Sequence, residues 1–116
     1  MVVDRIDDGL WKLEEDYTPT VFPDLTIKAG FVWNGASIPS IARMILSNEE
    51  LGVLEASCAH DLLYANNGRI SNTIRLTRKQ VDTIFEHELK FYGIDSVRAY
   101  LAYKAVRIFG GSHWNA

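Results

Sequence analysis

The sequence contains a single cysteine, Cys58, and only three histidines among its 116 residues. A lone cysteine excludes an internal disulfide, and its position on the apolar side of a predicted helix indicates a buried, unreactive thiol. The histidines His60, His87 and His113 are too few for a phosphohydrolase centre, which needs several histidines and paired aspartates. A zinc or two-metal site is therefore not expected.

Long apolar runs and a basic leader segment are also missing. No stretch approaches the roughly 18 apolar residues of a membrane span. The first residues, MVVDRIDDG, contain no apolar run after a basic segment. The sequence therefore predicts neither a membrane span nor a signal peptide.

Charge is unevenly divided along the chain. Residues 1–61 contain 11 acidic and 4 basic side chains, whereas residues 62–116 contain 4 acidic and 8 basic ones, for a net charge of −3. A basic second half is one mark of phosphate or nucleic-acid binding. Attraction between the two halves, or simple solvation, explains the same pattern, and nucleic-acid binding is not expected.

A helix predicted from Leu51 to Asn67 is the centre of the chain. At about 100° per residue, leucines and Cys58 form one stripe, while His60, Leu63 and Tyr64 lie roughly opposite. A helix that is apolar on two sides is usually buried between other elements. His60 and Asp61 on such a helix need partners, because an unpaired buried polar group costs about 1–3 kcal/mol.

The remaining predicted elements are strands first and helices afterwards. Strands are predicted at 10–17 and 25–33, a short edge strand at 20–22, and helices at about 37–46, 77–92 and 96–109, with a loop or short hairpin at 69–76. This order predicts an α+β fold, with a small antiparallel N-terminal sheet packed on three to four helices. We expect one domain over residues 1–116, mainly β and loops in 1–36, mainly helical in 37–110, with a tail at 111–116.

Helix ends are predicted from residues that bond the free backbone groups there. The expected caps are Ser37 or Ile38 ahead of Pro39, Ser47 or Asn48 before the central helix, Thr77 with Gln80, and Asp95 or Ser96. Asn34-Gly35 is the strongest turn dipeptide, and Gly68 fits a left-handed helix end.

His60 and Asp61 are the candidate catalytic residues. Adjacent helical side chains point about 100° apart, so the two can address one ligand or metal lying between them. His60 can serve as a general base, since imidazole titrates near neutral pH. The alternative is a buried polar core without catalysis.

Seven further side chains are candidates to line the site. They are Asn34, Ser37, Tyr64, Arg78, Asp82, Arg107 and Trp114. Ser37 could act as a nucleophile with Asn34 as an oxyanion donor, or both could make turn and cap bonds. Arg78 lies in a first helical turn, where a cation is not favoured by the helix dipole, which indicates a carboxylate or phosphate partner. A pair with Asp82 one turn later is the simpler interpretation.

No cofactor is expected. A hard divalent cation held by Asp61, Asp82 and carbonyl oxygens is the one metal site the sequence leaves open. Tyr64, Tyr100, Tyr103 and Trp114 could line a pocket, although aromatic residues at helical spacing usually belong to a core.

Four stretches together resemble the phage and prophage family known as domain of unknown function 1353. They are GFVWNGASIPSIAR at 30–43, AHDLLY at 59–64, TRKQVDTIF at 77–85 and AVRIFGGSHW at 105–114. The resemblance implies a phage-encoded protein of the host cytoplasm or the virion. It implies characteristic positions at Gly30, Phe31, Ala36, Ser37, Pro39, His60, Asp61, Tyr64, Arg78, Asp82, Gly93, Arg107, Gly110 and Trp114.

One position departs from the family pattern. The family usually has aspartate where this chain has Asn34, and asparagine keeps the hydrogen-bonding shape but loses the charge. A shorter similarity to secreted phospholipases rests on the spacing of His60, Asp61 and Tyr64 alone. Those enzymes need many disulfides and a glycine-rich calcium loop, which this sequence lacks, so shared chemistry is not expected.

Three functions remain open from the sequence. The first is a small hydrolase with His60 and Asp61 at its site. The second is a virion structural or assembly protein, in which a His-Asp-Arg network is buried. The third is a counter-defence protein that binds a phosphorylated small molecule through Arg78 and Arg107. Partners could be other phage proteins, further copies of this chain or a small ligand.

Overall fold

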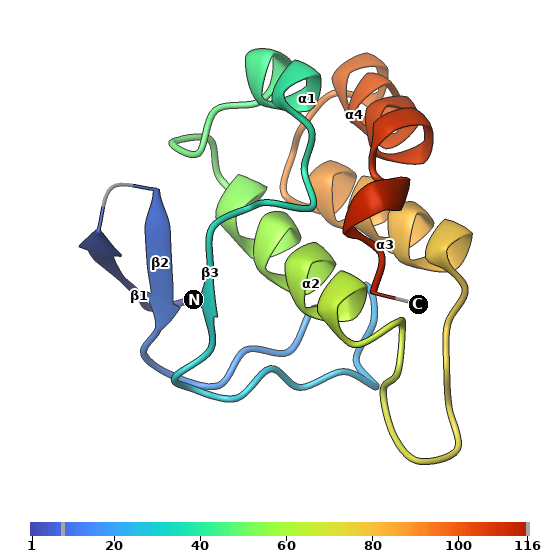
Figure 1. Ribbon diagram of the computed structural model, residues 1–116. Coiled ribbons are helices and arrows are strands. Elements are labelled where there is room, and N and C mark those ends of the chain that lie inside the picture. Colours follow the sequence, from blue (N-terminus) through green and yellow to red (C-terminus); the bar gives the residue numbers. More distant parts are fainter. Residues whose placement is uncertain (8, 116) are drawn as a thin grey trace.

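The computed structural model describes residues 1–7 and 9–115, which form a three-stranded sheet followed by four α-helices (Figure 1). The elements are β1 (Val3–Asp7), β2 (Leu10–Leu13), β3 (Val32–Trp33), α1 (Ser40–Ile45), α2 (Val53–Ala65), α3 (Arg78–Phe91), α4 (Ser96–Phe109) and a short 3-10 helix at Gly111–His113. The strands are antiparallel in the order β1-β2-β3. The predicted α+β class is confirmed.

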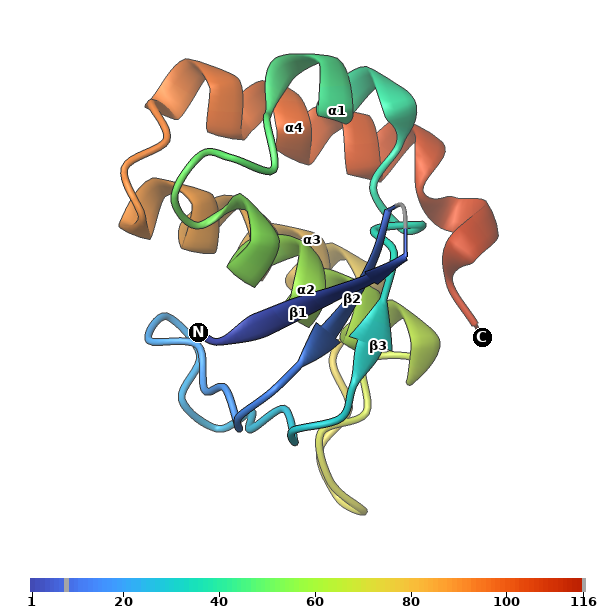
Figure 2. The same cartoon turned by 90° about the vertical axis from the view of Figure 1, so that its left-hand side faces the viewer.

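The central helix α2 is covered on two sides, as its pattern predicts. The sheet packs against one side and α3 against the other, while α1 and α4 lie side by side as an outer layer (Figures 1 and 2). One apolar core lies among α1, the start of α2, α3 and α4, and a second joins α2 to the N-terminal segment. No helix in the described ranges is long and apolar enough to cross a membrane.

The sheet is smaller than predicted. The predicted strand at 10–17 ends at Leu13, and the one at 25–33 is reduced to β3 and an isolated bridge between Tyr17 and Ile27. Gly30 has a φ of +97° and turns the chain, which separates β3 from the Tyr17–Ile27 bridge. The predicted edge strand at 20–22 is wrong, because this segment is a turn. β1 was not predicted, because four of its five residues are exposed and show no alternation.

Two predicted helix starts are also wrong. α1 begins after Pro39 with no side-chain cap, so Ser37 is free for other bonds. α2 begins after Gly52, not after Ser47 or Asn48, and Gly52 has a φ of +90°. A Cβ at Gly52 would lie 2.1 Å from Cβ of Tyr92, so both the backbone conformation and the close packing require glycine.

The predictions for α3 and α4 are confirmed. Thr77 and Gln80 form a reciprocal capping box at the start of α3, and the side chain of Asp95 accepts the backbone N–H of Arg98 at 3.0 Å at the start of α4. The inner face of α4 is made of small residues, chiefly alanine. This lets α3 and α1 approach closely and brings the end of α4 to the polar side chains of α2 and α3.

Candidate functional site

Asp82 is the centre of a buried polar network. Its Oδ1 accepts the Tyr64 hydroxyl at 2.7 Å and lies 2.8 Å from Nε2 of His60. Its Oδ2 accepts NH1 of Arg107 at 2.8 Å and lies 3.7 Å from NH1 of Arg78. The Asp82 side chain has no exposed surface. Three helices, α2, α3 and α4, therefore meet on one carboxylate.

The surroundings keep Asp82 ionised. Burial alone would raise its pKa, but the hydrogen bonds from His60, Tyr64 and Arg107 outweigh burial and hold the pKa below its usual value. Tyr64 responds in the opposite sense: burial and its bond to Asp82 raise the pKa of the phenol. The network therefore contains a fixed negative charge that two partly exposed arginines neutralise.

His60 is fully enclosed. Its Nδ1 lies 2.7 Å from the Ser37 hydroxyl, and its Nε2 faces Asp82. The ring packs between Tyr64 and Phe85, with centroid distances of 4.2 and 4.8 Å, and its side chain has 0% exposure. Both ring nitrogens are thus engaged, and no solvent or substrate reaches them in this arrangement.

The hydroxyl of Ser37 lies between Asp61 and His60. Ser37 has one hydroxyl proton, and its Oγ makes a short contact with Oδ1 of Asp61 as donor. Its oxygen also lies 2.7 Å from Nδ1 of His60. Because an ionised carboxylate only accepts, Nε2–H of His60 donates to Asp82. A Ser37 proton directed at Asp61 is not shared with His60.

Asp61 fastens the loop before α1. It accepts the backbone N–H groups of Gly35 at 2.7 Å and Ser37 at 3.1 Å, besides the Ser37 hydroxyl. On the far side of the same loop, the guanidinium of Arg43 donates to the carbonyl oxygen of Gly35 and, at 3.3 Å, to that of Asn34. The φ of Gly35 is +73°, a conformation that favours glycine. The loop is therefore held between a carboxylate and a guanidinium.

Arg78 caps the end of α4 instead of forming only a pair within its own helix. It donates to the carbonyl oxygens of Val106 and Arg107, each at 3.1 Å, and to the Tyr64 hydroxyl at 3.2 Å. The Val106 carbonyl also accepts the backbone N–H of Gly110 at 2.9 Å, so Arg78 adds a second donor at this helix end. Trp114 closes the network from outside, with its ring edge-on to Tyr64 at 5.1 Å.

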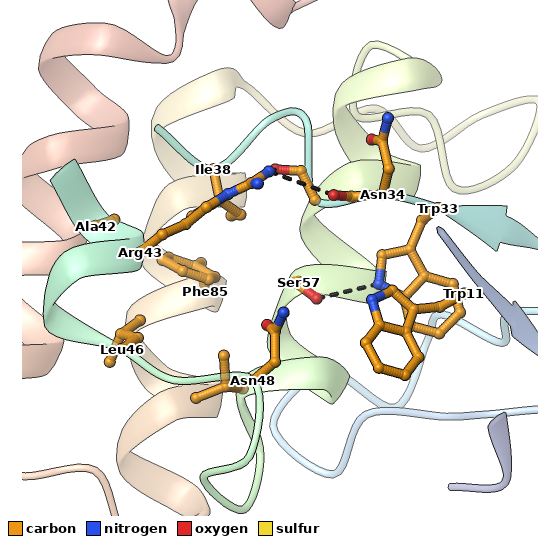
Figure 3. A pocket seen from close by; sticks show the side chains of 12 residues that line it. Trp11, Trp33, Asn34, Ile38, Ala42, Arg43, Leu46, Asn48, Ser57 and Phe85 are labelled. Atoms are coloured by element: carbon orange, nitrogen blue, oxygen red, sulfur yellow. Dashed lines mark hydrogen bonds between the residues drawn. The ribbon is translucent and has the colours of Figure 1, made fainter. Parts of the chain in front are cut away.

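Two hollows lie on either side of the loop. The first, here called the Asp61 groove, has a volume of about 320 Å³. It is lined by Leu10, Phe31, Val32, Trp33, Asn34, Ala36, Ser37, Asp61, Tyr64, Ala65 and His113. The second lies between the tryptophans of the sheet and the helices α1 and α3, with Arg43 reaching across it to Asn34 (Figure 3). Its volume is about 30 Å³, which holds about two water molecules but no organic ligand.

All nine candidate site residues belong to one continuous region. His60, Asp82, Tyr64, Arg78 and Arg107 form the network, with Trp114 against it. Ser37 and Asp61 join the network to the groove, and Asn34 lines both hollows. Tyr100 and Tyr103 contact each other and line neither hollow.

A hard cation held by Asp61 and Asp82 stays a prediction. The two carboxylates bind different partners, and the described part of the chain contains no cluster of three or more metal-binding side chains.

Sequence reasoning missed two features. The first is the part of Gly35 and Arg43 in holding the loop, for which the Asn34-Gly35 turn was only an indirect signal. The second is a separate buried cluster, in which Oε2 of Glu88 accepts the Tyr17 hydroxyl at 2.7 Å and the Tyr17 and Tyr92 hydroxyls lie 2.9 Å apart. Oε1 of Glu88 is buried without a partner among the described residues.

Burial raises the pKa of Glu88 to about 8, the Tyr17 bond only partly opposing it. Burial also raises the pKa of the nearby Cys58 thiol, which agrees with an unreactive cysteine.

Comparison with known proteins gives a family but no activity. No curated protein and no solved structure matches the chain. One family model covers residues 11–106, a range that includes every network residue except Arg107 and Trp114. The chain belongs to the family described as protein of unknown function, DUF1353.

Proposed function

We propose that the protein is a non-enzymatic assembly component that associates with further copies of itself through the outer surface of α1 and α4. The observation that carries this proposal is a set of exposed apolar side chains, here called the α1/α4 face. It comprises Ile41, Met44, Val97, Tyr100, Leu101 and Ile108, with exposures between 45% and 86%. Large exposed apolar patches usually mark interaction sites.

The burial of the network supports a structural interpretation of its polar residues. His60 is dry and bonded at both nitrogens, and Asp82 has no exposed surface. A group that must exchange protons with a substrate needs access to it. The same residues instead connect four segments, which is the task expected of a polar core.

The spacing along α4 suits pairing of two identical helices. Val97, Leu101, Lys104 and Ile108 lie along one exposed stripe, with steps of four, three and four residues. Two antiparallel copies would place Val97 opposite Ile108 and Leu101 opposite Lys104. The two Lys104 charges then avoid each other, and the lysine stem can pack while its amine reaches water.

A single charge on this stripe should abolish association. We expect the wild-type chain to show a mass that rises with concentration, and Leu101→Asp to remain a monomer, because a carboxylate buried in an apolar interface is strongly unfavourable. Sedimentation equilibrium between about 10 µM and 1 mM covers the relevant affinities. Ile74→Asp, at an exposed apolar residue away from the α1/α4 face, is the matched control. A wild-type chain that stays monomeric at 1 mM contradicts the proposal.

A hydrolase is the second candidate, favoured by one observation. Ser37, His60 and Asp82 form a chain with distances of 2.7 and 2.8 Å, the order of a serine nucleophile, a base and an acid. Two features weigh against catalysis. The Ser37 proton is directed to Asp61, and the backbone N–H groups of Gly35 and Ser37, which could stabilise an oxyanion, are taken by the same carboxylate.

Labelling with a fluorophosphonate tests this candidate directly. We expect no adduct on Ser37 after incubation at pH 8, measured by intact mass, because the Ser37 hydroxyl donates to Asp61 and His60 is closed to solvent. Trypsin treated in parallel shows that the reagent is active. The hydrolase would be established instead by a stoichiometric adduct on the wild-type chain that is absent in Ser37→Ala and in His60→Gln.

The contacts of Arg78 and Arg107 disfavour binding of a phosphorylated ligand through these side chains. Arg78 donates to carbonyl oxygens of α4, and Arg107 donates to Asp82. The Asp61 groove contains the carboxylate of Asp61, which would repel a phosphate. A phage setting, with the protein in the virion or the host cytoplasm, fits an assembly component and remains part of the proposal.

A further inference from the structure

We propose that the Asp61 groove binds a small organic cation, an ammonium group attached to an apolar or aromatic body. The ammonium meets the carboxylate of Asp61, and the body lies against the aromatic side chains of β3 and its approach. This site is separate from the α1/α4 face and does not depend on self-association.

The groove has the size and walls of a small-molecule site. Its volume of about 320 Å³ lies at the lower end of the range for such sites, roughly 300–1,000 Å³. Phe31 lines it and stacks on the buried Trp33 ring, with the ring centroids 6.0 Å apart and 5° between the ring planes. Val32, which is 41% exposed, contributes further apolar surface. Flat apolar walls of this kind favour an aliphatic or aromatic body.

The charge of the groove selects the sign of the ligand. Asp61 is half-buried, and no lysine, arginine or histidine forms an ion pair with it in the described residues. No lysine or arginine lines the groove, and His113 lies at its exposed rim. An anion would meet an uncompensated carboxylate, whereas a cation would supply the missing counter-charge.

Asp61 still has room for one more donor. Its Oδ1 accepts two bonds, from the amide and hydroxyl of Ser37, and its Oδ2 accepts one, from Gly35. A carboxylate offers about four acceptor positions, so one remains on Oδ2. The three existing bonds fix the orientation of the carboxylate in advance, which lowers the cost of binding. A single free position suits an ammonium better than a metal ion, which needs several ligands.

Three probes of one shape test the proposal. Phenethylammonium, 2-phenylethanol and 3-phenylpropanoate share a phenyl body and differ in charge. We expect phenethylammonium to bind with a dissociation constant of about 1 mM, at least about ten times more tightly than the alcohol, with no binding of the carboxylate. Titration followed by ¹H–¹⁵N NMR should shift the amide signals of Gly35 and Ser37 most, because both donate to Asp61.

Blocking the groove without touching the network gives the decisive variant. Ala65 is exposed and lines the groove, so Ala65→Trp should weaken phenethylammonium at least tenfold, while Ala29→Trp, at another exposed alanine outside the groove, should not. Asp61→Asn should weaken it similarly, provided its spectrum shows a folded chain. Three results would each overturn the proposed site. They are equal binding of phenethylammonium and 2-phenylethanol, binding unaffected by Ala65→Trp, and no binding at a phenethylammonium concentration 20 times the expected dissociation constant. Leu101→Asp should leave binding unchanged, which separates this result from the test of assembly.

Discussion

Asp82→Asn is expected to lower the free energy of unfolding by about 3–5 kcal/mol, the largest loss for any single isosteric change in the chain. Asparagine keeps the shape of the side chain but offers an NH2 group where Arg107 or His60 donates. The new amide NH2 group would then face the N–H of Arg107 or His60, two donors without an acceptor, inside a site closed to water. The two arginines would also lose the negative charge with which they pair. A loss of this size is a large share of the stability of a domain.

Urea unfolding at pH 7, followed by tryptophan fluorescence, measures this loss. Tyr64→Phe removes one of the bonds to Asp82 and should cost about 1–2 kcal/mol, which gives a graded comparison. Asp24→Asn, at an exposed residue, should change stability by less than about 0.5 kcal/mol. A loss below about 1 kcal/mol for Asp82→Asn would show that the network does not stabilise the fold.

The stability of the wild-type protein should fall as pH rises from about 4.5 to 8, and Glu88→Gln should remove most of this fall. The folded-state pKa of Glu88 is raised to about 8 because the side chain is buried, so the folded protein holds this proton more tightly than the unfolded chain. Its contribution to stability is complete below pH 4.5 and is lost as pH rises through 8, a change of about 3–5 kcal/mol. Glutamine cannot ionise and has no such dependence.

Comparison of the two chains at several pH values isolates this effect. At pH 5 Glu88→Gln should be no more stable than wild type. The NH2 group of glutamine would take the place of Oε1, which has no partner in the described cluster, so it would be buried without an acceptor. At pH 8.5 it should be the more stable of the two. The groups that face Glu88 are Tyr17, Tyr92, Glu55 and Cys58. Glu86→Gln, on the same helix but not fully buried, is the control, and parallel curves for Glu88→Gln and wild type would contradict the prediction.

Local signals predicted the helices of the second half well. Thr77 with Gln80 and the cap at Asp95 act within one turn, so the sequence contains all that determines where α3 and α4 begin. The strands were predicted less well, because pairing depends on partners far along the chain. β3 is two residues long, and its length is set by the turn at Gly30 and by pairing with β2.

The site was predicted as a set of residues but not as an arrangement. Helical geometry indicated that His60 and Asp61 point in different directions, and the two do bind different main partners, Asp82 and the Gly35 loop. The spacing could not show that both also contact Ser37. The burial of His60 and Asp82 could not be predicted from the sequence either, since it depends on how α3 and α4 pack over α2. That closure separates a dry network from an open catalytic site.

The way the network is assembled from the chain has a consequence for the kinetics of folding. Its bonds join Ser37 to His60, His60 to Asp82 and Asp82 to Arg107, each pair 22 to 25 residues apart. No single hairpin or helix pair contains the whole set, so the complete network forms only when all four segments have docked. Interactions that form after the transition state slow unfolding and leave the folding rate nearly unchanged. We therefore expect the polar network to lower the unfolding rate and so to lengthen the lifetime of the folded protein.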